Sequence, residues 1–418
     1  MEYKDTLNLP DTTLAMRANA AMREPEIQKI WEEMNIYEKM TGKRDKAHSF
    51  ILHDGPPYLS SDKIHIGTAL NKILKDILIK YKSLAGYYAP YVPGYDGHGL
   101  PIENAVVKNI KGGREAVTPV ELRQKCREFA GKNLKGQELE FKRLGCLGDW
   151  ENPYLTIAPE FEGEQIRVFG EMYKKDYVEK GLKPVYWCAA CETALAEAEV
   201  EYADHTSTSI YVRFKFDEES VKNIKVFSTL KPFKTSNVYA VIWTTTPWTI
   251  PSNLAICLHP KFEYTFFEYK NDVYFVVKEL LANFLENIGW EENNINILGS
   301  VKGGDLELLN AIHPLYNRKS TIILGEHVTT DAGTGVVHTA PGHGLEDYEV
   351  ACKYNIGVLS PLDDKGVWTN EVPDLEGVPY YKGNAIVIER LGKAGALLAK
   401  ADIVHSYPHC WRCKKPVI

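Results

Sequence analysis

The chain has 418 residues, of which 44% are hydrophobic and 25% are charged, and its formal net charge at pH 7 is −7. This length is too great for one ordinary hydrophobic core, so we expect two or three domains. The acidic balance argues against indiscriminate binding to nucleic acid, although a local basic face can still bind a polyanion. The first residues lack a basic segment followed by an apolar one, and no apolar run is long enough to span a bilayer, so we expect a cytoplasmic protein.

A strand, a loop and a helix are predicted in succession near the start of the chain. The apolar run Ser49–Gly55, "SFILHDG", ends at a turn signal. Apolar residues then recur at helical spacing from Ile66 to Leu84, and Gly86 is placed to end this helix.

His65, Gly67 and Thr68 stand where this predicted helix begins. A helix N-terminus exposes unpaired N–H groups and the positive end of the helix dipole, so these residues can hold a phosphate there. On these three residues alone, however, a helix that is merely capped is the better interpretation.

The next segment, Tyr87–Glu103 or "YYAPYVPGYDGHGLPIE", predicts a second strand that empties into a loop carrying Asp96 and His98. Two such loops side by side suit a doubly wound sheet, in which ligands lie beyond the carboxyl ends of the strands. Long helical patterns follow over Pro119–Leu144 and Pro159–Lys180.

A β-rich region follows the first cysteine pair. Ser207–Phe216 alternates with period two, Asn237–Thr246 is a β-branched run, and Tyr264–Val277 predicts a hairpin that turns at Lys270–Asp272. We therefore expect Ser207–Asp402 to form a separate β-rich α+β domain.

The eight cysteines are too dilute for a disulfide scaffold, but four of them form two CxxC pairs. The two pairs, Cys188 with Cys191 and Cys410 with Cys413, lie too far apart in the sequence for a zinc finger, unless a whole domain is inserted at the tip of a zinc ribbon. The four thiolates would then hold a structural, tetrahedral Zn²⁺. A redox role is less favoured because neither pair opens a helix after a strand. The other cysteines are expected to be buried as small hydrophobic residues: Cys126, Cys146, Cys257 and Cys352.

Three segments of the first half together resemble the catalytic domain of class I isoleucyl-tRNA synthetases. They are "HDGPPY" at His53–Tyr58, "HIG" at His65–Gly67 with "ALNKILKD" behind it, and Tyr87–Glu103. The related valyl and leucyl enzymes share the first signature but differ around it, so "GPPY" and "GHGLPIE" favour the isoleucine branch. The resemblance implies a Rossmann-type doubly wound parallel sheet, of which this chain holds the first half.

The resemblance also implies substrates and roles. Isoleucine, ATP with Mg²⁺, and tRNA(Ile) would be the partners. Pro56 would line the apolar pocket for the amino acid, Asp96 would accept its amino group, and His98 would belong to the same substrate site. We expect a monomer that does not bind membranes.

Two departures from the family pattern concern the activation site. Thr68 replaces the second histidine of the signature, and Leu59–Ser61 reads "LSS" in place of "ANG". In the family both histidines stabilise the triphosphate as pyrophosphate leaves. Thr68 can donate a hydrogen bond but cannot carry positive charge, so we expect weakened or altered adenylate formation.

Two segments of the β-rich region resemble the signatures of the isoleucyl editing domain: Trp243–Asn253 and Gly333–Tyr348. Valyl and leucyl relatives carry arginine where this chain has Thr246. Consecutive threonines at a strand end should place at least one hydroxyl in a cleft. Asp347 lies early in a helix predicted to start near Gly344, where a carboxylate is favoured and can meet an ammonium ion, although in isolation it would be interpreted as a helix cap.

By resemblance, Asp347 anchors the α-amino group of a mischarged aminoacyl ester. Other residues would shape the pocket and help to position the attacking water and the terminal adenosine: Thr244, Thr245, Thr246, Asn253 and His338. A second site is needed because a hydrophobic pocket distinguishes one methylene by only about 1–3 kcal/mol, a magnitude already established on isoleucyl-tRNA synthetase itself. The editing pocket should admit valine and exclude isoleucine by size.

Several other charged residues are expected to be solvated, without a role: His205, His343, Lys72, Lys75, Lys80 and Lys82. The predicted organisation is an N-terminal extension with the first half of the catalytic domain at 1–187, a zinc ribbon in two halves at 188–206 and 403–418, and the editing domain at 207–402. The second signature, "KMSKS", and an anticodon-binding region are not in this sequence. We therefore expect a fragment that cannot aminoacylate but retains ester hydrolysis.

Two alternatives differ from this interpretation. A free-standing trans-editing hydrolase would need no activation site, and the near-intact "HDGPPY", "HIG" and "GHGLPIE" segments argue against it. A non-enzymatic zinc module that binds RNA would leave the coexistence of Asp347 and the threonine run unexplained.

Overall fold

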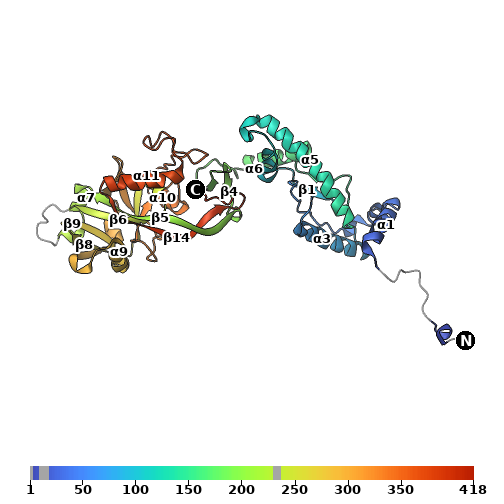
Figure 1. Ribbon diagram of the computed structural model, residues 1–418, viewed down its shortest axis with the longest axis horizontal. Helices are drawn as coiled ribbons and strands as arrows, with labels where there is room; N and C mark the ends of the chain where they lie inside the picture. Colours follow the sequence, from blue (N-terminus) through green and yellow to red (C-terminus); the bar gives the residue numbers. More distant parts are fainter. Residues whose placement is uncertain (1–2, 9–17, 229–236) are drawn as a thin grey trace. The chain divides into compact units, whose positions relative to one another are not determined.

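The computed structural model describes residues 3–8, 18–228 and 237–418. The chain divides into two compact units, Met1–Lys180 and Gly181–Ile418 (Figure 1). Among the described residues, none of the helices combines the length and apolar character that crossing a bilayer requires.

The first unit is mainly helical, and the long helices coincide with the predicted apolar periodicities. Its helices and 3₁₀ helices (η) are η1 (Tyr3–Thr6), α1 (Ala20–Glu33), α2 (Ile36–Gly42), η2 (Lys46–His48), α3 (Ile66–Leu84), α4 (Leu100–Val107), η3 (Arg114–Ala116), α5 (Pro119–Arg143) and α6 (Pro159–Lys174). Helix α3 ends at Leu84 and Gly86 follows with φ of 96°, as the sequence predicts. Helix α6 is shorter than predicted, because the chain turns at Asp176 with a left-handed φ of 57°.

Helix α5 begins at a complete capping box. The hydroxyl of Thr118 accepts the N–H of Glu121, and the carboxylate of Glu121 accepts the N–H of Thr118 at 2.8 Å. Ala130 and Phe141 of this helix are buried in a core that also contains Tyr95. The cap therefore fixes the start of a helix that packs, through Ala130 and Phe141, on the segment that carries Asp96.

Replacing Thr118 with alanine is expected to lower the opening free energy of the first turn of α5 by about 1 kcal/mol, because the N–H of Glu121 loses its acceptor. Hydrogen exchange at the Glu121 amide measures this change. Thr118→Ser keeps the hydroxyl and is the matched control. Equal exchange in the alanine and serine variants would contradict the proposed cap energy.

The strands of the first unit are shorter than predicted. Strand β1 (Gly94–Tyr95) pairs in parallel with β2 (Tyr154–Leu155), and isolated parallel bridges join Ser49 to Tyr88 and Tyr58 to Asp96. The prediction of a regular strand at Ser49–Gly55 is wrong, because only Ser49 of this segment is in a bridge. The reason is chemical, since prolines 56, 57, 90 and 93 have no N–H group and interrupt the ladder. The parallel direction, with α3 connecting the bridged segments, is nevertheless that of a βαβ unit.

The second unit is built on a mixed ten-stranded sheet. The order is β10-β8-β9-β6-β5-β11-β12-β7-β13. Strand β14 is a further partner of β5, which also pairs with β6 and β11. The pairs β6–β9 and β7–β12 are parallel, and the other pairs are antiparallel. The strands are β5 (Val200–Phe216), β6 (Val238–Thr244), β7 (Ala255–Leu258), β8 (Glu263–Tyr269), β9 (Asp272–Val277), β10 (Asn296–Lys302), β11 (Asn310–Ile312), β12 (Lys319–Leu324), β13 (Val336–Thr339) and β14 (Leu397–Cys410).

Helices cover both faces of this sheet. Helix α11 (Tyr380–Lys393) lies along one face and α9 (Leu281–Ile288) along the other (Figure 1). The alternation of β5 explains this division: Val212 packs in the core that contains Leu391 of α11, whereas Tyr211 packs in the core that contains Phe284 of α9. The remaining short elements are β3 (Tyr186–Cys188), β4 (Thr193–Leu195), η4 (Glu197–Glu199), α7 (Glu218–Lys222), α8 (Lys225–Ser228), η5 (Pro247–Ser252), η6 (Lys278–Leu280), η7 (Glu292–Asn294), η8 (Gly303–Leu306) and α10 (Leu345–Lys353).

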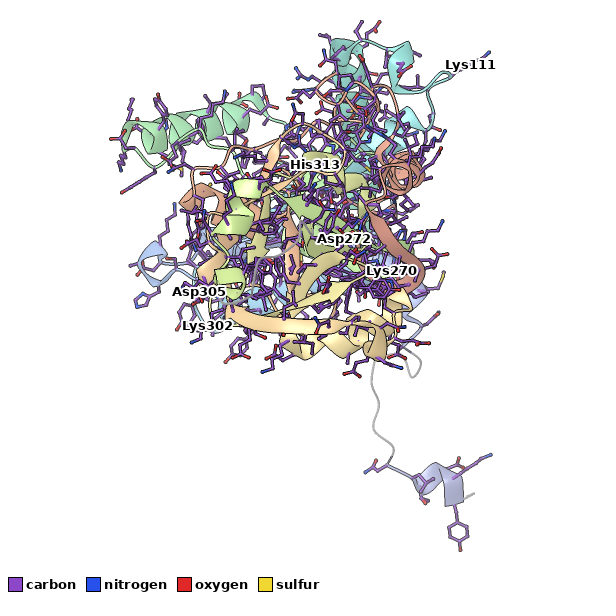
Figure 2. The ribbon with its side chains drawn as sticks, turned by 90° about the vertical axis from the view of Figure 1, so that its left-hand side faces the viewer. Lys111, Lys270, Asp272, Lys302, Asp305 and His313 are labelled. Carbon is purple, nitrogen blue, oxygen red and sulfur yellow. The ribbon has the colours of Figure 1, made fainter. Side chains whose placement is uncertain are left out.

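The hairpin predicted between Tyr264 and Val277 is confirmed. Strands β8 and β9 are joined by Lys270 and Asn271, whose φ angles of 51° and 70° are both positive, as a two-residue hairpin turn requires. Lys270 and Asp272 lie next to each other at this turn (Figure 2).

Candidate functional site

A cavity of about 430 Å³ lies in the second unit, at the end of β6. The end of β6, strand β13 and the first turn of α10 contribute to its wall. Five residues predicted for the editing site line it together: Thr244, Thr245, Thr246, His338 and Asp347. Residues distant in sequence therefore meet where the sequence segments Trp243–Asn253 and Gly333–Tyr348 come together.

Asp347 lies early in α10, as predicted, where it is the third residue, and it lines the cavity. Its Oδ2 accepts the N–H of Ala340 at 2.8 Å. Burial raises the pKa of Asp347, although the N–H of Ala340 acts in the opposite direction. A half-buried carboxylate in this position is suited to a cationic group that enters the cavity and replaces its lost hydration.

The threonine run extends from the end of β6 to Thr246, the N-cap residue of η5. Thr244 is the last residue of β6, and its Oγ1 accepts the N–H of Thr246 at 3.1 Å. The Oγ1 atoms of Thr244 and Thr246 lie 3.2 Å apart. Thr244 and Thr246 thus line the cavity with linked hydroxyls instead of isolated ones.

His338 lies on β13 with both ring nitrogens occupied. Its Nε2 is 2.8 Å from the Oγ1 of Thr249, and its Nδ1 is 2.8 Å from the Nδ2 of Asn253. Burial lowers the pKa of His338 to about 3, so the ring is neutral at pH 7.

Asn253 is the one predicted editing residue that does not line the cavity. It is fully buried behind His338, where its amide also donates to the carbonyl of Ala255 at 2.8 Å and accepts from Ser320. The prediction that Asn253 shapes the pocket is therefore corrected to an indirect role through the imidazole.

Other cavity residues were not predicted from the sequence: Trp243, Thr249, His327, Asp331 and Glu346. Thr249 stands three residues after Thr246, the spacing that places two side chains on one edge of a 3₁₀ helix, so this signal was available. His327 and Asp331 belong to an irregular loop before Gly333, where no periodicity exists. With Glu346 and Asp347, Asp331 gives the cavity an acidic wall.

His343 is not the solvated loop residue that the sequence predicts. It lines the same cavity, its ring meets Trp248 edge-on with centroids 4.9 Å apart, and its Nε2 is 3.0 Å from Ser252 Oγ. Burial lowers the pKa of His343 to about 4. His205, also predicted to be solvated, is partly covered by Tyr407 at a centroid distance of 5.1 Å.

The two CxxC pairs meet in space. The sulfur atoms of Cys188, Cys191, Cys410 and Cys413 all lie within 4.8 Å of one another. Four sulfurs at Zn–S bonds of about 2.3 Å would be separated by roughly 3.8 Å, so this donor set fits a closed tetrahedral zinc site. Burial raises the pKa of the Cys188 thiol to about 11, which disfavours thiolates unless a cation compensates them.

The long ladder of β5 and β14 accounts for the wide spacing of the pairs. Its register runs from Leu397 opposite Val212 to Cys410 opposite Val200, so the chain returns to the first cysteine pair after building the sheet. Of the other cysteines, Cys146 and Cys257 are buried as predicted and Cys126 is half-buried. Cys352 is exposed on α10, which corrects its prediction.

In the first unit, His65 caps α3. Its Nδ1 accepts the N–H groups of Gly67 and Thr68 at 3.1 and 3.3 Å, and its Nε2 is 3.0 Å from the Oγ1 of Thr68. The hydroxyl that replaces the second signature histidine is therefore bonded to the first histidine. Locally, the structure has the capped helix end that was considered as the alternative to a phosphate site.

The other predicted residues of the first unit lie on two loops that touch. Asp96 and the Pro56–Tyr58 segment are joined by backbone hydrogen bonds, from the N–H of Asp96 to the carbonyl of Pro57 at 2.9 Å and from Leu59 back to Asp96 at 3.0 Å. Pro56 is half-buried, and the carboxylate of Asp96 accepts the N–H of His98 at 3.2 Å. His98 is exposed and its Nε2 lies 3.1 Å from Glu162. The predicted side-by-side placement of the two loops is confirmed.

Lys72 is not part of a solvated helix face. It is only 2% exposed and pairs with Asp54, which is 1% exposed and also meets Lys75 at 2.8 Å. Burial acts to raise the pKa of Asp54, but the two lysines outweigh it and the pKa is lowered. The sequence interpretation missed this pairing because Asp54 approaches from a separate segment, inside "HDGPPY".

Comparisons with known proteins agree with this assembly of segments. The family model described as "tRNA synthetases class I (I, L, M and V)" matches residues 26–322, and that described as "Leucyl-tRNA synthetase, editing domain" matches residues 274–374. The isoleucine–tRNA ligases of Caldanaerobacter subterraneus subsp. tengcongensis, Thermoanaerobacter pseudethanolicus and Caldicellulosiruptor bescii are 53%, 54% and 52% identical to the chain over 418 residues. Each alignment covers 100% of this chain and 44% or 45% of the relative, so the chain spans less than half the length of these curated relatives.

Proposed function

The chain belongs to the class I tRNA synthetase family of the isoleucine, leucine, methionine and valine enzymes, and from this membership we propose that it is the part of an isoleucyl-tRNA synthetase that proofreads valine. The observation that carries the proposal is the cavity in which Asp347, the threonine run and His338 meet. Relatives named isoleucine–tRNA ligase, at 52–54% identity, support the choice of isoleucine as the cognate amino acid.

Ester hydrolysis follows from the groups on this wall. Asp347 accepts the α-ammonium group of a valyl ester on the terminal ribose of tRNA(Ile), and the acidic wall formed with Asp331 and Glu346 favours that cation. A water molecule held among the threonine hydroxyls attacks the ester carbon. The ribose oxygen leaves and takes a proton, which releases valine and the intact tRNA. Holding both reactants in place supplies the rate advantage.

The larger protein would carry out aminoacylation with the first unit. There, ATP with Mg²⁺ and isoleucine would occupy the loops that carry Pro56, Asp96 and His98. Because the N–H groups of Gly67 and Thr68 are bonded to His65, phosphate would be met by the side chains of His65 and Thr68 instead of by the helix backbone. We assign 1–187 to an N-terminal extension and the first half of a Rossmann-type domain, 188–206 and 403–418 to a zinc ribbon, and 207–402 to the editing domain. The break between units at Lys180 and Gly181 supports the first boundary. The four cysteines would hold Zn²⁺, which would supply structural cross-linking.

The test is deacylation of valyl-tRNA(Ile) and isoleucyl-tRNA(Ile) by the 418-residue chain. The rate of each reaction is measured from the release of the labelled amino acid. We expect the valyl ester to be hydrolysed at least about tenfold faster than the isoleucyl ester, because the larger side chain is excluded by size. Hydrolysis of both esters at the rate of buffer alone would reject the proposal. Equal acceleration of both would reject the size discrimination.

A further inference from the structure

The carbonyl of Ala255 determines which way round the side-chain amide of Asn253 lies, and therefore which of its hydrogen bonds are donated and which are accepted. A carbonyl can only accept, so the atom of Asn253 that lies 2.8 Å from it is the amide nitrogen Nδ2. Ser320 donates to the other amide atom, Oδ1, which agrees with this orientation. The second hydrogen of Nδ2 is then directed at the Nδ1 of His338, 2.8 Å away.

This orientation determines which nitrogen of His338 carries its proton. Nδ1 accepts from Asn253, so the neutral ring carries its hydrogen on Nε2 and donates it to the Oγ1 of Thr249 at 2.8 Å. Thr249 in turn donates its only hydroxyl proton to the main-chain carbonyl of Thr246 at 2.9 Å. The burial that lowers the pKa of His338 to about 3 agrees with a ring that remains neutral.

The direction continues along the threonine run. Because the proton of Thr249 is committed, its Oγ1 can only accept from the hydroxyl of Thr246, which lies 3.4 Å away. Thr246 can then only accept from Thr244, at 3.2 Å, and Thr244 already accepts the N–H of Thr246. The hydroxyl protons of Thr244, Thr246 and Thr249, which together we call the threonine wall, are therefore all donated within it. One oxygen lone pair of Thr244 and one of Thr246 remain free to accept a hydrogen bond.

We propose that His338 is a positioning residue that acts as a fixed, neutral hydrogen-bond donor, and that it thereby makes the threonine wall a set of acceptors. This inference rests on the proposed editing function. Together with Asp347, such a wall binds donor groups, namely the ammonium group, a ribose hydroxyl and the hydrogens of the attacking water. A water held by its hydrogens turns a lone pair toward the ester carbon. The ring does not take the proton of that water, since Nδ1 is occupied and Nε2 already carries hydrogen.

The protonation pattern can be measured without any substrate. In the chain labelled with ¹⁵N-histidine, with His338→Gln to identify the signal, NMR should show hydrogen on Nε2 and none on Nδ1 from about pH 5 to pH 8. Asn253→Asp should move the hydrogen to Nδ1, because a carboxylate can only accept. Hydrogen on Nδ1 in the unmodified chain, or titration of His338 within this range, would overturn the proposal.

Kinetics test the functional half. Thr249→Val, which removes the hydroxyl at nearly constant shape, should lower kcat for valyl-tRNA(Ile) hydrolysis by roughly tenfold to a hundredfold with little change in KM. Thr249→Ser should recover most of the loss, and Asn253→Asp should also reduce kcat. Thr265→Val is the matched control, since Thr265 is a buried threonine that bonds to Ser300 and does not line the cavity.

The two measurements separate this inference from the function on which it rests. A fully active Thr249→Val chain would overturn the directed wall while leaving the editing function intact. An unmodified chain with the stated protonation pattern but no hydrolysis would defeat the proposed function, and with it the role given to the wall.

Discussion

Replacing Asp347 with asparagine is expected to lower kcat/KM for hydrolysis of valyl-tRNA(Ile) by about tenfold to a hundredfold, since a hydrogen bond to a charged group contributes about 1.5–3 kcal/mol. Asparagine is nearly the same size and can still accept the N–H of Ala340, but it cannot neutralise an ammonium ion. Deacylation under single-turnover conditions measures the effect. Glu346→Gln, an exposed carboxylate on the same wall, is the matched comparison and should lose less.

The pH dependence should separate this charge effect from damage to the fold. Burial raises the pKa of Asp347, and the ionised form makes the proposed contact, so kcat/KM of the unmodified chain falls as the pH drops through that raised pKa. The asparagine variant lacks this decline. A raised pKa also means that the folded state binds the proton more tightly than the unfolded state, so the ionised carboxylate lowers stability at neutral pH. The thermal midpoint of Asp347→Asn should therefore be equal or higher, and full activity in this variant would contradict the assignment.

Replacing Cys410 with serine is expected to reduce the zinc content from one ion per chain to none. Cys410 is buried at the end of β14 and contributes one of four clustered sulfurs. Binding of a structural zinc contributes about 10–16 kcal/mol to folding in isolated zinc-finger peptides, so its loss should open this end of the second unit. Metal analysis measures the content, and hydrogen exchange at β3 and β4 measures the opening.

Cys352→Ser is the matched control for the zinc experiment, because Cys352 is exposed on α10 and lies outside the cluster. It should retain both the zinc and the protection of β3 and β4. A zinc content that is unchanged in Cys410→Ser would argue against the four-cysteine site. Loss of zinc without faster exchange would instead show that the metal does not stabilise this part of the fold.

Periodicity predicted the elements that depend on local sequence. The helices α3 and α5 follow apolar spacing and caps, and the β8–β9 turn follows from two residues that accept positive φ. The prediction of a regular strand near Pro56 and Pro93 was wrong because it followed the apolar pattern and did not count the N–H groups that the prolines remove from the ladder. The strand, loop and helix order nevertheless suited a doubly wound sheet, and the parallel direction implied by the family resemblance is observed in the pairs of this unit.

The candidate site was predicted where residues stand at the end of a predicted strand or the start of a predicted helix. It was missed where residues lie on an irregular loop, such as His327 and Asp331, or depend on a distant partner. The threonine run and Asp347 lie at a strand end and a helix start, which sequence patterns mark. The buried positions of Asn253 and Lys72 could not be predicted from such patterns. Asn253 is hydrogen-bonded to His338 and Ser320, and Lys72 forms an ion pair with Asp54, and these partners come from other segments of the chain. A polar residue that satisfies a buried partner has the same sequence signal as one that meets solvent.

The antiparallel ladder of β5 and β14 places Val200 directly opposite Cys410, so the backbone departs from and comes back to a single location. The segment that forms the ten-stranded sheet therefore begins and ends at neighbouring positions. Joining these two positions by a short turn would delete the sheet and leave the two cysteine pairs next to each other. Transplanting this segment onto another host protein would need only two neighbouring attachment points, because every residue that lines the cavity lies between Val200 and Cys410 in the sequence.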